Sequence, residues 1–450
     1  MQGAVRLEPR IPIDGRSHLC CNEIKMMMNP TEGDKPTMNK VPPSGEWSER
    51  VHRLQAKLET AGMAGCLVTQ NVGIYYFTGS MQAGYVFVPA VGEPTYYVRR
   101  SVTRALAESR IRTTELLSFR AFGEQLSADY PQSFAGTGEA GGQLPLIGSD
   151  LDVMPAQLYL KLGEVISGVR IADASGLLRS VRSVKSAYEI DCISNAAEAV
   201  AAALEEGLAV LKPGMTELEL MAVIESGIRR RGHSGLMRMR GYNQEIMTGI
   251  VSAGEAAAEP SYFDGPAGGR GLSPASPKSV SLRPIGRGEP ILLDLGCCID
   301  GYVIDQTRTA VIGALKPELA AAYRVSEEIV RATERLLRPG TTPEQLYVQA
   351  LEMAESAGLA GHFMGYGKDQ VKFLGHGIGL EIDEWPVLAR GFREPLEPGM
   401  TLAVEPKFTF PGQGVVGIEN TYLITEEGCR TLTVSPEKLY EYFGANDDRG

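Results

Sequence analysis

Short runs of strand and helix periodicity follow one another through the first part of the chain. Residues 47–64 carry apolar side chains at helical spacing and end near a glycine. Residues 65–79 read as a strand followed by a turn, and residues 84–99 read as a hairpin. This alternation predicts a first domain of α/β type over residues 46–184.

The pattern changes at residue 185, where a long helix is predicted. Ser186 and Glu189 form a capping-box pattern, and the apolar spacing then continues over residues 189–211. A helix that starts directly after a run of short elements marks a domain boundary, so we expect a second domain over residues 185–440.

A repeat divides this second domain into two halves. The segment LKPGMTELEL (211–220) is similar to LRPGTTPEQL (337–346), and each closes one helix with Pro-Gly before a Thr opens the next. Residues 289–313 and 399–425 then each read as two strands joined by a turn. The repeat predicts a pseudo-symmetric domain in which two hairpins are brought together.

Each strand of the two hairpins carries one acid within an apolar run. The four acids are Asp294 and Asp305 in the first hairpin, and Glu405 and Glu419 in the second. A turn at the Asp300-Gly301 dipeptide would place residue 305 opposite residue 296, on the same face as residue 294. In the second hairpin, a turn within residues 411–414 would place 405 and 419 nearly opposite, with the register left open.

Four converging carboxylates repel one another and lose hydration, although a single acid in a strand usually faces solvent. Divalent cations are the natural compensation. His376, one of only five histidines, lies in GHGIGLEIDEWP and adds an imidazole. This set of donors suits Mn²⁺, Fe²⁺ or Co²⁺, and two ions would match the charge of four carboxylates and could share a hydroxide for hydrolysis.

Composition narrows the class of protein. The net charge of −11 argues against a broad nucleic-acid surface, and no stretch approaches the length of a membrane span. Seven cysteines without regular spacing are typical of reduced thiols in a cytoplasmic protein. Residues 1–45, rich in Met, Pro, Gly and charge, are expected to form a flexible tail or an over-long start, with Met38 as an alternative first residue.

Four segments carry a family resemblance. The segments DLGCCIDGYVIDQTRT, GHGIGLEIDE, LEPGMTLAVEP and GIENTYLIT resemble the metal-site blocks of the aminopeptidase P, prolidase, creatinase and methionine aminopeptidase superfamily. YYFTGS and its surroundings resemble the N-terminal domain of the aminopeptidase P, prolidase and creatinase branch. The resemblance implies an α/β (α+β) chain, with a creatinase-like N-terminal α/β domain followed by a pita-bread catalytic domain.

The resemblance also implies a site and its cofactors. It implies a dinuclear site; from the donor types we expect Mn²⁺ first, with Co²⁺, Fe²⁺ or Zn²⁺ as alternatives. Members of this branch commonly form dimers or tetramers, so we expect a homodimer. Asp305 and Glu419 would bridge the ions, and Glu405 would also orient the attacking hydroxide. The complete set of implied ligands is Asp294, Asp305, His376, Glu405 and Glu419.

The sequence departs from these peptidases at three accessory histidines. Their positions are held by Asp383, Lys372 and Ser261. Lys372 would offer positive charge to a substrate carboxylate or oxyanion. Asp383 would relay a proton if its pKa were raised, or would act only as a hydrogen-bond acceptor near the metals.

A Gly/Pro-rich insertion over residues 261–290 precedes the first metal strand and is a candidate wall of the substrate pocket. Ser261 opens it, and Arg270 within it would bind a substrate carboxylate, unless it is an ordinary surface arginine.

Three hypotheses follow. The first is a metal-dependent aminopeptidase or Xaa-Pro-type dipeptidase that acts on a short peptide. The second is a pita-bread enzyme that acts on a small non-peptide C–N or C–S compound. The third is a binding protein that retains the metal without catalysis. The five retained ligands favour an enzyme, and the missing histidines give weight to the second hypothesis.

Overall fold

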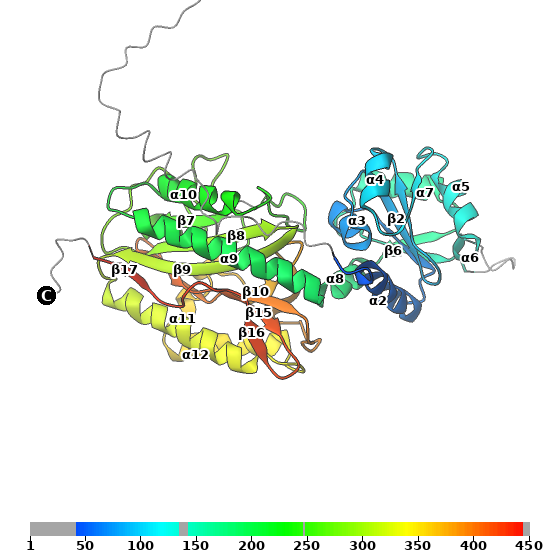
Figure 1. The fold of residues 1–450 in the computed structure, drawn as a ribbon. Helices are drawn as coiled ribbons and strands as arrows, with labels where there is room; N and C mark the ends of the chain where they lie inside the picture. The colour runs from blue at the N-terminus through cyan, green and yellow to red at the C-terminus, as the bar shows by residue number, and fades with distance from the viewer. Residues whose placement is uncertain (1–41, 135–142, 246–247, 444–450) are drawn as a thin grey trace, which may run out of the picture.

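The computed structural model describes residues 42–134, 143–245 and 248–443. The expected N-terminal tail lies outside the described residues except for its last four. Two lobes follow one another along the chain, the first blue to cyan and the second green to red (Figure 1). Within the described ranges, no helix combines the length and apolarity needed to cross a membrane.

The first lobe is built on a six-stranded sheet in the order β4-β3-β2-β1-β5-β6. β1, β2 and β3 pair antiparallel, whereas β4, β5 and β6 join parallel to their neighbours. Its strands are β1 (Gly65–Val68), β2 (Gly84–Pro89), β3 (Thr95–Val98), β4 (Arg112–Glu115), β5 (Leu146–Ser149) and β6 (Arg170–Asp173). Its helices are α2 (Glu46–Thr60), α3 (Asn71–Thr78), α4 (Val102–Glu108), α5 (Phe122–Asp129), α6 (Pro131–Phe134), α7 (Ala156–Val165) and α8 (Ser175–Ser183).

The helix and the hairpin expected in this lobe are confirmed. α2 begins one residue before the predicted start and buries Trp47, Val51, Leu54 and Leu58, which share one helical face. The predicted hairpin is the β2–β3 pair.

The turn expected after β1 was wrong, because residues 71–78 form α3. Its apolar side chains, including Val72 and Tyr76, are buried at helical spacing, and Gly79 ends the helix with a φ of 77°.

The second lobe holds the repeat. Its helices are α9 (Ala187–Val210), α10 (Glu217–Arg230), η2 (Gly254–Ala258), α11 (Pro317–Leu336), α12 (Pro343–Ser356), η3 (Ala360–His362) and η4 (Gly367–Asp369). Its strands are β7 (Gly249–Ala253), β8 (Ile291–Ile299), β9 (Tyr302–Ile312), β10 (Phe373–Gly377), β11 (Glu384–Ala389), β12 (Thr401–Val404), β13 (Lys407–Phe410), β14 (Gly414–Gly417), β15 (Asn420–Ile424), β16 (Cys429–Thr431) and β17 (Tyr440–Tyr442).

The repeat has the structure that its sequence predicts. The capping box at Ser186 and Glu189 starts α9, and equivalent boxes at Thr216 and Thr342 start α10 and α12 after the two Pro-Gly segments. α9 and α10 lie beside β7, β8 and β9, while α11 and α12 lie on the opposite side of the lobe (Figure 1). The two halves meet where Thr307 and Glu419 exchange backbone hydrogen bonds of 3.4 and 3.1 Å.

The two hairpins have the predicted turns. β8 and β9 join at Asp300-Gly301, whose φ angles of 50° and 89° match a tight hairpin turn, and residue 305 pairs with residue 296 as expected. The ladders of β12 with β15 and of β13 with β14 keep one common register, so residues 405 and 419 lie opposite each other between them.

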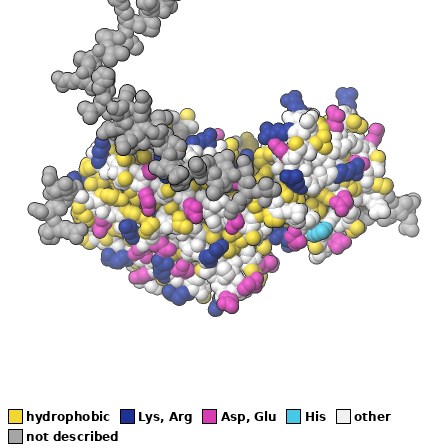
Figure 2. Space-filling model, viewed as in Figure 1, with side chains coloured by type: hydrophobic (Ala, Val, Ile, Leu, Met, Phe, Trp, Pro, Cys, Tyr) yellow, Lys and Arg dark blue, Asp and Glu magenta, His cyan; other side chains and the backbone are white. Residues whose placement is uncertain are grey.

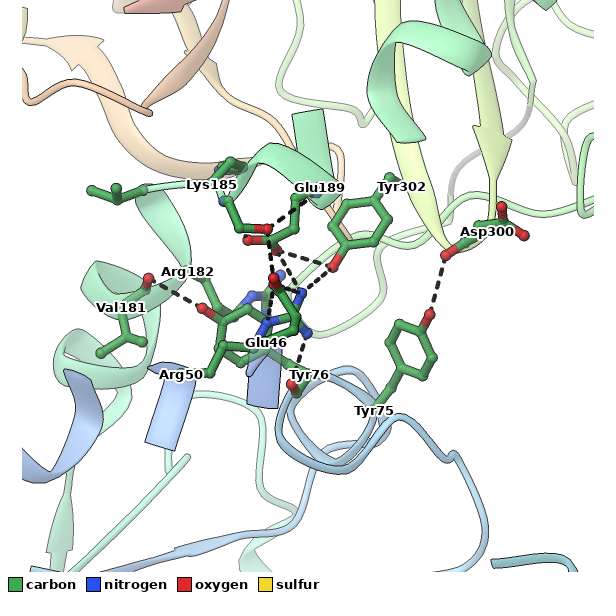
Figure 3. Close-up of polar contacts among 12 residues, drawn as sticks. Glu46, Arg50, Tyr75, Tyr76, Val181, Arg182, Lys185, Glu189, Asp300 and Tyr302 are labelled. Atoms are coloured by element: carbon green, nitrogen blue, oxygen red, sulfur yellow. Dashed lines mark hydrogen bonds and ion pairs between the residues drawn. The ribbon is translucent and has the colours of Figure 1, made fainter. Parts of the chain in front are cut away.

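The two lobes share a buried polar contact. Arg50 of α2 donates to the hydroxyl of Tyr302 at 3.0 Å, and that hydroxyl donates to Glu189 of α9 at 3.0 Å (Figure 3). Tyr75 of α3 donates to the carbonyl of Asp300 at 3.3 Å (Figure 3). The first lobe therefore contacts the turn and the first residue of β9 in the hairpin that carries Asp294 and Asp305.

Acidic and basic side chains are interspersed on the face of the molecule in Figure 2.

Candidate metal centre

The five predicted ligands converge from both halves of the second lobe. Asp294 and Asp305 come from β8 and β9, and His376 comes from β10. Glu405 follows β12 and Glu419 precedes β15. The five side chains lie close together because the first hairpin pairs with the second at Thr307 and Glu419.

Three of these ligands form a compact set. One ligand atom each from Asp305, His376 and Glu419 lies within 4.8 Å of the others, and all three residues are buried. Thr307 donates its hydroxyl to Glu419 Oε2 at 2.7 Å, whereas Glu419 Oε1 is buried without a hydrogen-bond partner among the described residues. Two carboxylates, one imidazole and an unpartnered buried oxygen fit one divalent ion.

The ring of His376 is oriented by its neighbours. Nδ1 lies 3.0 Å from the carbonyl of Gly377 and 3.5 Å from Asp383 Oδ1. Donation from Nδ1 leaves Nε2, 3.6 Å from Glu405 Oε1, as the ligand nitrogen facing the carboxylates. Burial alone would lower the pKa of His376, but Asp383 and Glu405 outweigh burial and raise it.

A lysine occupies the other side of the cluster. Lys407 Nζ lies 2.6 Å from Glu405 Oε2, 3.0 Å from Glu419 Oε2 and 3.2 Å from Asp294 Oδ2. Its side chain is 1% exposed. Burial lowers the pKa of this ammonium, but the three carboxylates raise it well above its ordinary value.

The pKa values of the four carboxylates shift in different directions in this environment. Burial and neighbouring acids raise the pKa of Asp294 and that of Asp305, and the pKa of Glu405 rises to about 7. Burial also penalises the charged form of Glu419, yet Lys407 and His376 lower its pKa overall. The cluster therefore requires positive charge beyond Lys407 to be fully ionised.

Only one of the two ions that the family resemblance implies fits the side chains of this site. Asp305, His376 and Glu419 fit one ion, but the Lys407 ammonium already contacts the oxygens of Asp294 and Glu419 that a second ion would need. The described residues thus fit one of the two expected ions and do not fit the other.

A cavity of about 60 Å³ adjoins the cluster. Lys278, from the predicted insertion, is buried at its wall with its ammonium 2.9 Å from the centre of the Phe263 ring. Burial lowers the pKa of Lys278 to about 8, although the nearby acids oppose the shift. Other side chains that line the cavity include Asp294, Asp305, His376, Asp383 and Glu405.

The other predicted site residues are dispersed. Asp383 lines this cavity, with a side chain that is 38% exposed. Lys372 is exposed and does not line the cavity, so it does not face Asp383 there. Ser261 lines a neighbouring hollow of about 410 Å³.

Arg270 is placed at the surface, which is the alternative that the sequence left open. It pairs with Glu255 at 3.1 Å and with Glu259 at 2.6 Å. Because both carboxylates already engage its guanidinium, Arg270 is not presented to the cavity, and it is absent from the cavity lining.

Two functional candidates were missed by sequence reasoning. Lys407 follows Glu405 by two residues in a segment that the sequence predicts as one strand, so the period of two would have placed both on one face. Lys278 had no such signal, since it lies in a loop whose path is set by tertiary contacts.

A second buried network holds the segment that follows His376. Glu384 bonds Arg182 and, at 3.0 Å, Lys185, while Glu381 pairs with Arg182 at 2.8 Å and accepts from Gln70 at 2.6 Å. Arg182 and Gln70 belong to the first lobe, which therefore fixes the backbone on both sides of Asp383.

The fold and this centre define a class of protein: a hydrolase with a candidate metal site inside a pseudo-symmetric pita-bread domain, preceded by a creatinase-like domain. Residues 191–426 match the family model described as "Metallopeptidase family M24". Residues 50–184 match the model described as "Creatinase/Prolidase N-terminal domain". The chain belongs to metallopeptidase family M24 and is an enzyme of the metallopeptidase-like hydrolase type.

Similar proteins share both domains. A probable dipeptidase PepE of Mycobacterium tuberculosis is 29% identical over 399 residues, covering 87% of this chain and 96% of the relative. A Xaa-Pro dipeptidase of Pyrococcus furiosus is 27% identical over 397 residues, covering 87% and 99%. The solved structure of dipeptidase PepE from Mycobacterium ulcerans matches with a TM-score of 0.72 at 27% identity, covering 89% of this chain and 99% of that structure.

Proposed function

We propose that this chain is a dipeptidase of the Xaa-Pro type that depends on a divalent metal and holds the free carboxylate of its substrate with Lys278. The observation that carries this proposal is the shared cavity: Lys278 and four of the five predicted metal ligands, all except Glu419, line the same small space. A dipeptide has one peptide bond a short distance from a carboxylate, which matches an ion centre beside a cation.

The chain's own residues divide the work. Asp305, His376 and Glu419 would hold a divalent ion, which when bound would supply a Lewis acid for the peptide carbonyl. Glu405 orients the attacking water, with its Oε2 fixed by Lys407 at 2.6 Å. Asp383 accepts or relays a proton beside His376, in place of the accessory histidine, and Lys278 aligns the substrate.

The relatives support dipeptides as substrates. The two relatives described above, each matching over 87% of this chain, are named a probable dipeptidase and a Xaa-Pro dipeptidase. Mn²⁺ as the metal, with Co²⁺, Fe²⁺ or Zn²⁺ as alternatives, remains a prediction from the donor types. The homodimer and the cytoplasmic location also remain predictions.

Amino-acid release from a peptide panel tests this function. The panel contains Xaa-Pro dipeptides, dipeptides without proline, tripeptides, and the C-terminal amide of each dipeptide, all with Mn²⁺- or Co²⁺-loaded protein. We expect release from Xaa-Pro dipeptides, weak release from their amides, and none from the His376→Ala variant. Equal rates on acids and amides would reject the carboxylate contact, and no release from folded, metal-loaded protein would reject the dipeptidase.

A second candidate is an enzyme that acts on a small non-peptide C–N or C–S compound. It is favoured by the cavity volume of about 60 Å³, which holds roughly two waters, and by Asp383, Lys372 and Ser261 at the accessory histidine positions. Metal-dependent turnover of small anionic amides or thioethers, without release from any dipeptide, would establish this candidate instead.

A further inference from the structure

The buried ammonium of Lys407 lies where the family resemblance places a metal ion. We propose that Lys407 permanently takes the place of the second ion, so that each chain binds a single divalent ion at Asp305, His376 and Glu419. This inference rests on the proposed function only in placing an ion at this centre.

The contacts of Lys407 identify which ion is replaced. Asp305 and Glu419 are the expected bridging ligands, so Asp294 would serve one ion only. Lys407 Nζ lies 3.2 Å from Asp294 Oδ2 and 3.0 Å from the Glu419 oxygen that also accepts from Thr307. A divalent ion bound to these oxygens at roughly 2.1 Å would overlap and repel the ammonium.

The other oxygens remain available to the first ion. Glu419 Oε1 is buried without a hydrogen-bond partner among the described residues, and the compact set of Asp305, His376 and Glu419 does not include Asp294. The five predicted ligands thus form two sets that share Glu419. Asp294, Glu405 and Glu419 surround the ammonium. Asp305, His376 and the free oxygen of Glu419 are open to an ion.

The backbone is built to hold the lysine there. Lys407 pairs with Gly417 across the β13–β14 ladder, and a Cβ at residue 417 would meet Lys407 Cγ at 2.7 Å and Lys407 Cα at 2.9 Å. The missing side chain at Gly417 therefore makes room for the stem of the lysine. Because its ammonium is buried, the lysine would lose its compensation if it left the three carboxylates.

Replacing an ion by an ammonium changes the chemistry of the centre. An ammonium supplies positive charge and three hydrogen-bond donors, but it neither exchanges ligands nor leaves with a chelator. Lys407 is accordingly a positioning residue: it fixes Glu405 Oε2 and neutralises part of the cluster, while Asp305, His376 and Glu419 would hold the single ion.

Metal content measured on the whole chain tests the proposal. Protein stripped by chelator and reloaded with Mn²⁺ is analysed for metal per chain by mass spectrometry and by electron paramagnetic resonance. We expect one ion with the six-line spectrum of isolated Mn²⁺. Lys407→Gly, which removes the ammonium and leaves space, should bind two ions with a spin-coupled spectrum.

Two control variants separate charge from space. Lys407→Met keeps the volume of the side chain and should stay at one ion. Lys278→Met removes a different buried lysine, which lines the adjoining cavity and does not bond these carboxylates, and should also stay at one ion. Circular dichroism verifies folding, and Lys407→Ala replaces the glycine variant if the latter does not fold.

Three results would overturn the proposal: two ions or a coupled spectrum in the unaltered chain, no bound ion, or a single ion in folded Lys407→Gly. The count is independent of turnover. One ion without dipeptide hydrolysis would therefore reject the proposed function alone, whereas hydrolysis with two ions would reject this inference alone.

Discussion

Two buried lysines bring positive charge to the same cluster in different ways. Lys407 bonds three carboxylates, and its pKa is raised well above the ordinary value, so it stays charged. Lys278 is buried over the Phe263 ring, and its pKa is lowered from 10.5 to about 8. In the proposals made above, the first lysine replaces an ion of the site and the second binds the carboxylate of the substrate.

Lys278 therefore predicts a pH dependence of substrate binding. Its ammonium is charged below pH 8 and becomes neutral above it, so the KM for a dipeptide should rise as pH increases through 8. Lys278→Met should raise this KM by about tenfold at pH 7, the expected loss of one hydrogen bond to a charged group. Kinetics from pH 6.5 to 9.5 check both effects.

The C-terminal amide of the same dipeptide serves as the matched control, because it has no carboxylate to lose. An equal rise of KM for acid and amide, or an unchanged profile in Lys278→Met, would assign the titration to another group.

At the scale of elements, the two hairpins were predictable because their signals are local. Period-two alternation and the Asp300-Gly301 turn set the register of β8 and β9, and this register places Asp294 and Asp305 on one face. The helix α3 was not predicted, since its short apolar run fits a strand equally well. The position of Lys278 depends on the path of a long loop, which no local pattern sets.

Gly417 tests the packing of the second hairpin. An added Cβ would lie 2.6 Å from the carbonyl oxygen of Pro406 and 2.9 Å from Lys407 Cα, and this backbone cannot move aside without shifting β13. Gly417→Ala should therefore lower the free energy of unfolding by about 2 kcal/mol, as overpacking does, and weaken Mn²⁺ binding. Urea denaturation and metal titration measure the two effects.

Gly163, within α7, provides the control, because a Cβ there meets no atom within 4 Å. Gly163→Ala should raise the free energy of unfolding by roughly 0.5–1 kcal/mol through helix propensity, with unchanged metal binding. An unaltered stability of Gly417→Ala would show that the ladder has more room than its geometry indicates.

At the scale of the whole molecule, the first lobe supports the centre at two places. Arg50 and Tyr75 contact the β8–β9 hairpin (Figure 3), and Arg182 contacts the segment that contains Asp383. Buried polar contacts across the lobes have no sequence signature, because each partner looks like an ordinary surface charge in its own segment. The two domains could be predicted from sequence, but their joint could not.

The ion pairs of Glu384 allow the stability of the contact between the two lobes to be tested. Burial penalises its charge, but Arg182 and Lys185 lower its pKa from an ordinary value of 4.5 to about 2. An acid whose pKa is lower in the folded state than in the unfolded state stabilises the fold at pH values above its unfolded pKa. This contribution of Glu384 is lost as the pH falls from 4.5 towards 2. The difference corresponds to about 3 kcal/mol at pH 7, so Glu384→Gln should reduce the free energy of unfolding by about that amount.

The loss caused by Glu384→Gln should shrink in acid, by about 1 kcal/mol between pH 5 and pH 3.5, because the original glutamate is then partly protonated in the unfolded chain. Urea denaturation at several pH values compares the two proteins. Glu344→Gln is the control: Glu344 pairs with an exposed arginine, Arg393, and its removal should leave the curves nearly unchanged. A destabilisation that is the same at every pH would show that Glu384 acts through packing, and that the joint between the lobes does not depend on its charge.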